Sequence, residues 1–133
     1  MKLSKHFSYE DLTYTSYDIG NHPEGELPIQ KMTYLGYYLL DPIKEQYPNM
    51  AISSAFRSPE LNTLLKSHEK SQHLLGEAAD IVIPRNTEEA YIWMKFHLTY
   101  GQLILERHNN KEWIHISLPR YGTQNMKAWK WNR

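Results

Sequence analysis

The segment SQHLLGEAAD, from Ser71 to Asp80, combines the side-chain types of a metal site with a means of bringing them together. Fully extended, the chain from His73 to Asp80 would span roughly 23 Å, too far for one metal ion whose ligand bonds are each about 2 Å. Gly76 allows the turn that would bring both side chains to one place. Asp80 stands in an apolar run, where an ionised carboxylate is costly to bury without compensation. A metal ion would compensate this charge, and an arginine or a helix end is the alternative.

The segment EWIHIS adds a second histidine, His115, on a predicted strand. Because strand side chains alternate, its isoleucines fall on one face, and Trp113 and His115 fall on the other. The earlier run QLILE alternates in the same way, and a hairpin symmetric about Asn109 and Asn110 would put Glu106 across from Trp113. Glu106 would then lie diagonal to His115, at roughly 7 Å. The alternative is a solvated sheet face whose polar residues are incidental.

Together, His73, Asp80 and His115 supply two imidazoles and one carboxylate, a set that can hold zinc and leave a fourth position for water. This is the layout of a hydrolytic site, in which the metal lowers the pKa of water and a nearby carboxylate acts as general base. Arg57, at the end of another predicted strand, can supply the cation that neutralises substrate charge or an oxyanion. The chain has no GxSxG, HExxH or P-loop motif, and its lack of cysteine excludes thiolate nucleophiles and thiolate metal ligands.

Length and charge narrow the function classes further. A chain of 133 residues predicts one domain spanning residues 1–133. Basic and acidic residues number 15 each, so no basic excess indicates a nucleic-acid partner. The sequence contains neither a signal-peptide pattern at its start nor an apolar run of roughly 18 residues that could span a membrane. We therefore expect a protein made in the cytoplasm with no nucleic-acid or membrane partner, and we further expect a monomer.

Periodicity and turn residues predict the elements that must position these side chains. Helices are expected after Ser8, over residues 29–46 with a kink at Pro42, from Ser58 to Leu65, and from a cap at Asn86 and Glu89 to Gly101. Strands are expected over residues 51–56, 78–83, 102–106 and 113–118, the last two forming the hairpin. The segment from Pro119 onward shows no clear period.

Four runs, in this order along the chain, resemble the zinc D-Ala-D-Ala carboxypeptidase family: SSAFRSPELN, SQHLLGEAADI, GQLILE and WIHIS. Relatives of that family include phage endolysins, D-Ala-D-Ala dipeptidases and the Hedgehog signalling domain, and the resemblance extends from about Phe7 to Leu118. It implies an α+β fold in which helices pack on one face of a small antiparallel sheet, with the zinc site on the other face. It also implies hydrolysis of a peptide bond in bacterial peptidoglycan stem peptides, by a D-Ala-D-Ala carboxypeptidase or an endolysin-type endopeptidase.

The resemblance also assigns roles to individual residues. The family motif SxHxxGxAxD falls on residues 71–80, and its last metal histidine falls on His115. The implied zinc ligands are therefore His73, Asp80 and His115. The family's arginine falls on Arg57, which implies that Arg57 binds a carboxylate or carbonyl group of the substrate. Ser71 and Trp113 are expected to contact substrate, Trp113 as a wall of the cleft.

Two glutamates remain candidates for the general base. Several relatives place an acid three residues before the last histidine, which is Glu112 in this sequence. The QLIxE run instead presents Glu106, which strand alternation puts on the same face as His115. A frayed strand start or a bulge could turn Glu112 inward, so both stay candidates.

Three functions are compatible with the sequence. The first is a peptidoglycan peptidase, such as a phage- or prophage-encoded lysin that reaches the cell wall without its own export signal. The second is a D-Ala-D-Ala dipeptidase acting in the cytoplasm. The third is a zinc-stabilised binding module without activity, as in the Hedgehog branch, although such a module would need neither a base nor Arg57.

Overall fold

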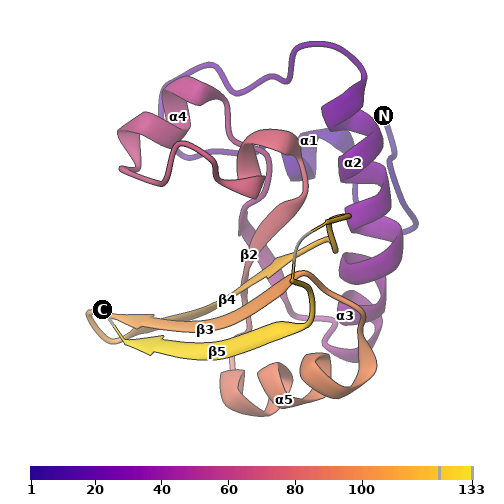
Figure 1. The fold of residues 1–133 in the computed structure, drawn as a ribbon, viewed down its shortest axis with the longest axis vertical. Coiled ribbons are helices and arrows are strands. Elements are labelled where there is room, and N and C mark those ends of the chain that lie inside the picture. The colour runs from indigo at the N-terminus through magenta and orange to yellow at the C-terminus, as the bar shows by residue number, and fades with distance from the viewer. Residues whose placement is uncertain (123, 133) are drawn as a thin grey trace.

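A five-stranded sheet forms the centre of the molecule in a computed structural model that describes residues 1–122 and 124–132 (Figure 1). The strand order is β1-β2-β4-β3-β5, and all pairings are antiparallel except that of β3 with β5. The antiparallel expectation therefore holds for four strands, and the fifth makes the sheet mixed. The strands are β1 (Ala51–Ser54), β2 (Ala78–Val82), β3 (Gln102–His108), β4 (Lys111–Ser117) and β5 (Lys127–Asn132).

The helices begin and end close to where the sequence predicts. They are α1 (Tyr9–Leu12), α2 (Leu27–Leu35), α3 (Asp41–Gln46), α4 (Pro59–Leu64) and α5 (Thr87–His97), with the 3-10 helix η2 (Gln72–Leu75). In the part of the chain that the structure describes, no helix has the length and apolar composition needed to cross a membrane.

The helix expected over residues 29–46 is interrupted by a π-helical turn, η1 (Gly36–Leu40), between α2 and α3. In this turn the backbone N–H of Asp41 donates to the carbonyl of Gly36, one residue beyond the α-helical partner. Pro42 follows directly, and its ring cannot donate and would clash with the carbonyl four residues earlier in a regular α-helix. The widened turn thus accommodates the proline at the position where the sequence predicts a kink.

Two local expectations were wrong in detail. Asn86 adopts a left-handed conformation with φ of 57° and makes no side-chain capping bond, so the predicted capping box of α5 does not form. The first strand ends at Ser54 rather than at Phe56, because the backbone N–H of Phe56 donates to the carbonyl of Leu12 instead of to a strand. The chain leaves the sheet at this point and carries Arg57 toward the site.

The two faces of the sheet differ in composition. One face carries fully buried aliphatic side chains of β2, β3 and β4, and α5 packs against β3 and β4 on this side. Because side chains alternate, the residues between these aliphatic positions point to the opposite face. That opposite face, called the cleft face below, carries Asp80, Ile104, Glu106, Trp113 and His115. The core and the polar residues of interest therefore share the same strands.

Candidate active site

His73 reaches the cleft face through a tight turn that begins at Ser71. The hydroxyl of Ser71 accepts a hydrogen bond from the backbone N–H of His73 at 3.2 Å, which caps η2. Gly76 ends the turn with φ of 75°, and a Cβ at this position would lie 2.6 Å from the carbonyl oxygen of Pro28. Both the conformation and the lack of space require glycine, as the sequence predicts.

The hairpin register brings His115 and Glu106 onto the cleft face as expected. Asn109 and Asn110 form the turn with φ of 49° and 64°, the positive values that a two-residue hairpin turn requires. Glu106 pairs with Trp113, so the predicted symmetric register is confirmed. In the neighbouring pair of strands, Asp80 lies directly opposite His115.

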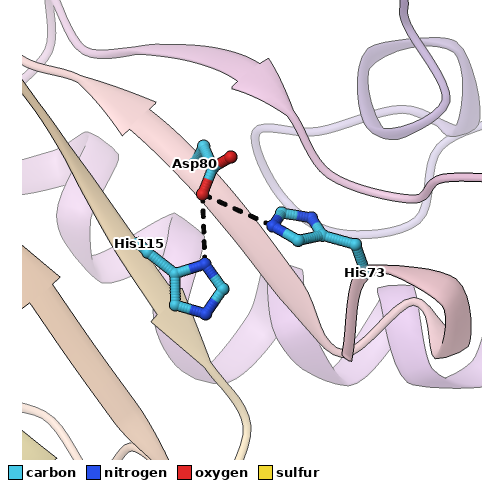
Figure 2. Close-up of side chains that lie close together, drawn as sticks. All are labelled: His73, Asp80 and His115. Carbon is cyan, nitrogen blue, oxygen red and sulfur yellow. Dashed lines mark hydrogen bonds and ion pairs between the residues drawn. The ribbon is translucent and has the colours of Figure 1, made fainter. Parts of the chain in front are cut away.

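The three predicted ligands converge on one point (Figure 2). The Oδ1 atom of Asp80 lies 3.4 Å from Nε2 of His73 and 3.1 Å from Nδ1 of His115. One ligand atom from each residue lies within 4.8 Å of the other two, and the two imidazole rings meet edge to face. Such a set of three nitrogen and oxygen ligands suits zinc.

The hydrogen bonding of His73 is that of a metal ligand. Its Nδ1 lies 2.6 Å from the carbonyl oxygen of Ala55, which can only accept, so Nδ1 carries the proton. In the neutral ring, Nε2 then turns a lone pair toward the carboxylate of Asp80. Two facing acceptors repel each other unless a cation lies between them. Backbone carbonyls commonly orient metal-bound histidines in this way, so the residues present fit a bound zinc ion.

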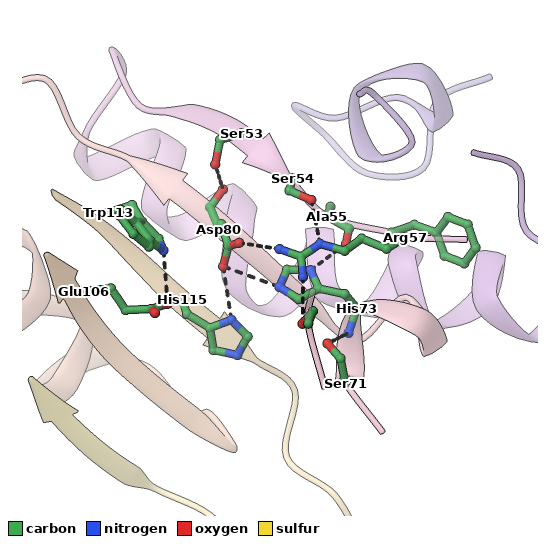
Figure 3. A network of polar contacts seen from close by, with 12 residues as sticks. Ser53, Ser54, Ala55, Arg57, Ser71, His73, Asp80, Glu106, Trp113 and His115 are labelled. Atoms are coloured by element: carbon green, nitrogen blue, oxygen red, sulfur yellow. Dashed lines mark hydrogen bonds and ion pairs between the residues drawn. The ribbon is translucent and has the colours of Figure 1, made fainter. Parts of the chain in front are cut away.

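Asp80 divides its two carboxylate oxygens between a cation and the imidazoles (Figure 3). Arg57 donates to Oδ2 at 2.8 Å, while Oδ1 faces both histidines. Burial by itself raises the pKa of the Asp80 carboxyl, but its interactions with the imidazoles of His73 and His115 outweigh the burial and hold the pKa well below its usual range. Asp80 is therefore ionised, as a metal ligand must be. The arginine partner considered as an alternative is present together with the histidines.

Arg57 is held firmly within the site. Its side chain donates to the hydroxyls of Ser54 at 3.0 Å and Ser67 at 3.2 Å as well as to Asp80, and only 8% of the residue is exposed. It also lines the cleft. Arg57 thus orients Asp80 and borders the space where a substrate would lie.

The two candidate bases lie in different surroundings. Glu106 is 5% exposed, and its Oε2 accepts a hydrogen bond from the indole N–H of Trp113 at 3.0 Å (Figure 3). Glu112 borders the cleft at the end of the hairpin, but its carboxylate pairs with Arg107 at 2.8 Å. Arg107 also pairs with Glu88 on α5, on the helix-covered side of the sheet. No bulge turns Glu112 toward His115 along the paired residues of β3 and β4.

A cleft of about 960 Å³ lies over the cleft face and contains all of these groups. Ser71 and Trp113, the expected substrate contacts, both line it. Among the lining residues that sequence reasoning missed are Arg120 and Trp131, which come from the segment after β4. The alternation of tryptophan and lysine in AWKWN, residues 128–132, is the pattern that could have predicted a strand in this segment.

The site geometry agrees with the comparison to known families. The sequence model of the family described as Peptidase M15 matches residues 5–117, which include every residue of the converged cluster. The chain belongs to the Peptidase M15 family. This family membership makes the protein a metallopeptidase, and the family's dependence on zinc agrees with the His73, Asp80 and His115 cluster. Among curated proteins, none matches the chain.

Proposed function

We propose that this M15 peptidase uses zinc to hydrolyse a peptide bond in the stem peptides of bacterial peptidoglycan. The observation that carries the proposal is the convergence of three ligand atoms within 4.8 Å of one another, on a cleft face that also holds a buried glutamate. His73, Asp80 and His115 would hold the metal. When bound, zinc supplies Lewis-acid polarisation of a carbonyl and lowers the pKa of water.

Glu106 is the general base in this proposal. It lies on the same face as His115, on the neighbouring strand and one diagonal step away, which is roughly 7 Å between Cα positions and within reach of a bridging water. Its carboxylate would take a proton from the attacking water and give it to the departing amine. The indole of Trp113 fixes the orientation of that carboxylate through the hydrogen bond to Oε2. Glu112 is less suited to this role, because its carboxylate pairs with Arg107 toward the opposite face.

Arg57 has two roles in the proposal. Its bond to Oδ2 fixes Asp80 so that Oδ1 faces the histidines. Its guanidinium also lines the cleft, where it would attract a substrate carboxylate or stabilise negative charge that develops on the scissile carbonyl. Ser71 and Trp113 would complete the contacts with the peptide.

The test is digestion of purified peptidoglycan by the zinc-loaded protein, with the products identified by mass spectrometry. We expect shortened or cleaved stem peptides, with loss of D-alanine if the enzyme is a carboxypeptidase and an internal cut if it is an endopeptidase. The Glu106→Gln protein, which retains the ligands, is the matched control and should give no products. Cleavage of free D-Ala-D-Ala alone would indicate a cytoplasmic dipeptidase instead. No cleavage of either substrate by zinc-loaded protein would favour a zinc-stabilised binding module.

A further inference from the structure

The C-terminal strand adds a wall to the cleft from outside the residues that match the family. The match ends at residue 117, whereas β5 begins at Lys127 and pairs in parallel with β3 along the open edge of the sheet (Figure 1). In this register Trp129 lies beside Ile104, and Trp131 lies beside Glu106. Paired residues on neighbouring strands point to the same face, so both tryptophans point to the cleft face.

The other face of β5 is fixed by contacts with the body of the protein. Ala128 packs against the hydrophobic core, and Lys130 pairs with Glu88 of α5. The alternation of these contacts with the tryptophans sets the register of the strand, because a slip of one residue would turn every side chain to the wrong face. Trp131 therefore points toward the cleft.

Glu106 stands between two tryptophans across the sheet. Trp113 on β4 and Trp131 on β5 are both paired with it, and each neighbouring strand is about 4.8 Å away. Both indoles line the cleft, and Trp131 is 47% exposed. Polar groups also line the cleft: Lys111 lies at the hairpin end near these indoles, and Arg120, which is held by an ion pair of 3.2 Å with Glu77, lies toward the other end of β4.

We propose that Trp131 forms a subsite for a sugar ring of the peptidoglycan glycan strand, to which the stem peptide is attached. This proposal rests on the proposed function. A pyranose ring has an apolar face of C–H groups that stacks on an indole, and an edge of hydroxyls that needs polar partners. Lys111, two residues from Trp113 on the same face of β4, supplies such a donor at this end of the cleft. A wholly apolar ligand would instead strip water from the Lys111 ammonium without replacing the hydrogen bonds of that water.

The position of Trp131 relates the sugar to the reacting bond. From Trp131 to His115 the path crosses two strand spacings and advances two residues along β4, a distance of about 12 Å. An extended peptide covers that distance with roughly three residues. The sugar subsite therefore places the first residues of the stem peptide over the metal ligands.

The first experiment measures binding without catalysis. A peptide-free tetrasaccharide of the glycan strand is titrated into the zinc-loaded protein, and Kd is measured by NMR. We expect saturable binding that Trp131→Ala weakens about tenfold, equivalent to about 1.4 kcal/mol, with Trp131→Phe intermediate. Phe96→Ala is the matched control, since Phe96 is 75% exposed on α5, across the sheet from the cleft, and should not change Kd. Absence of saturable binding, or an unchanged Kd in Trp131→Ala protein that melts like the wild type, would overturn the proposal.

The second experiment compares two substrates that differ only in the sugar. The stem peptide alone and the same peptide attached to its disaccharide are hydrolysed by the wild type and by Trp131→Phe, which keeps an aromatic ring to support β5. We expect kcat/KM for the disaccharide substrate to fall several-fold and kcat/KM for the free peptide to stay unchanged. An equal fall for both substrates would show a peptide subsite and contradict a sugar subsite. If neither substrate is cleaved by the wild type, the proposed function fails, while the tetrasaccharide titration still decides whether the sugar binds.

Discussion

The two faces of the central strands have opposite tasks although their residues are neighbours in the sequence. On the helix-covered face, Ile114 and its aliphatic neighbours are fully buried and form the core. On the cleft face, Asp80 and Glu106 are also nearly buried, yet each carries a carboxyl group that accepts a hydrogen bond. Burying charge costs stability, whereas burying aliphatic groups supplies it. The strands thus stabilise the molecule with one face and hold reactive groups with the other.

The largest effect is expected from loss of a metal ligand on the cleft face. We expect His115→Ala to abolish peptidase activity, because two remaining ligands cannot hold zinc in the three-ligand geometry of a catalytic site. The fold should persist, since His115 is only partly buried and lies outside the aliphatic core. Hydrolysis of peptidoglycan and a urea denaturation curve check both parts. An active variant would contradict the ligand assignment.

The next largest effect separates the two glutamates of the hairpin. We expect Glu106→Gln to lower kcat by about 10²–10⁴-fold with zinc retained, the range for loss of a general base. Glu112→Gln is the control, because it removes only an exposed ion pair with Arg107, and it should change kcat little. Steady-state kinetics with metal analysis tests the contrast. The reversed result, with Glu112→Gln inactive and Glu106→Gln active, would show that Glu112 is the general base.

Removal of Arg57 tests what compensates the buried charge of Asp80 on the cleft face. We expect Arg57→Ala to destabilise the metal-free protein by about 3–5 kcal/mol, because the buried carboxylate of Asp80 loses its guanidinium partner. Bound zinc should reduce this loss, since a cation would then compensate Asp80. Urea denaturation with and without zinc measures the difference. Equal destabilisation in both states would mean that zinc does not contact Asp80.

A core substitution on the opposite face should affect stability alone. We expect Ile114→Ala to lower the free energy of unfolding by about 2–5 kcal/mol, because it opens a cavity among fully buried aliphatic side chains. At a temperature where the variant stays folded, its kcat should stay near that of the wild type. A large loss of kcat in the folded variant would show that the two faces are not separable.

Much of the site was predictable because it depends on local rules. Alternation along β4 placed His115 opposite the core, and the two asparagines of the turn fixed the register that puts Glu106 across from Trp113. Gly76 marked the turn that returns His73 to Asp80. Each inference needed only residues that are close in sequence.

The contacts that escaped prediction join residues that are distant in the sequence. The bonds from Arg57 to Asp80 and from His73 to Ala55 depend on how the chain leaves β1, which no local pattern encodes. The parallel pairing of β5 with β3 depends on which sheet edge remains open after the other strands have paired. The role of Trp131 in the cleft follows only from that tertiary pairing.

The central claim is that the cleft face holds one zinc ion through His73, Asp80 and His115, and calorimetric titration of zinc into metal-free protein tests it most directly. The account predicts about one equivalent of zinc bound by the wild type, and loss of this binding in the folded His73→Ala, His115→Ala double variant. A double variant that still binds a full equivalent of zinc with the affinity of the wild type would contradict the claim.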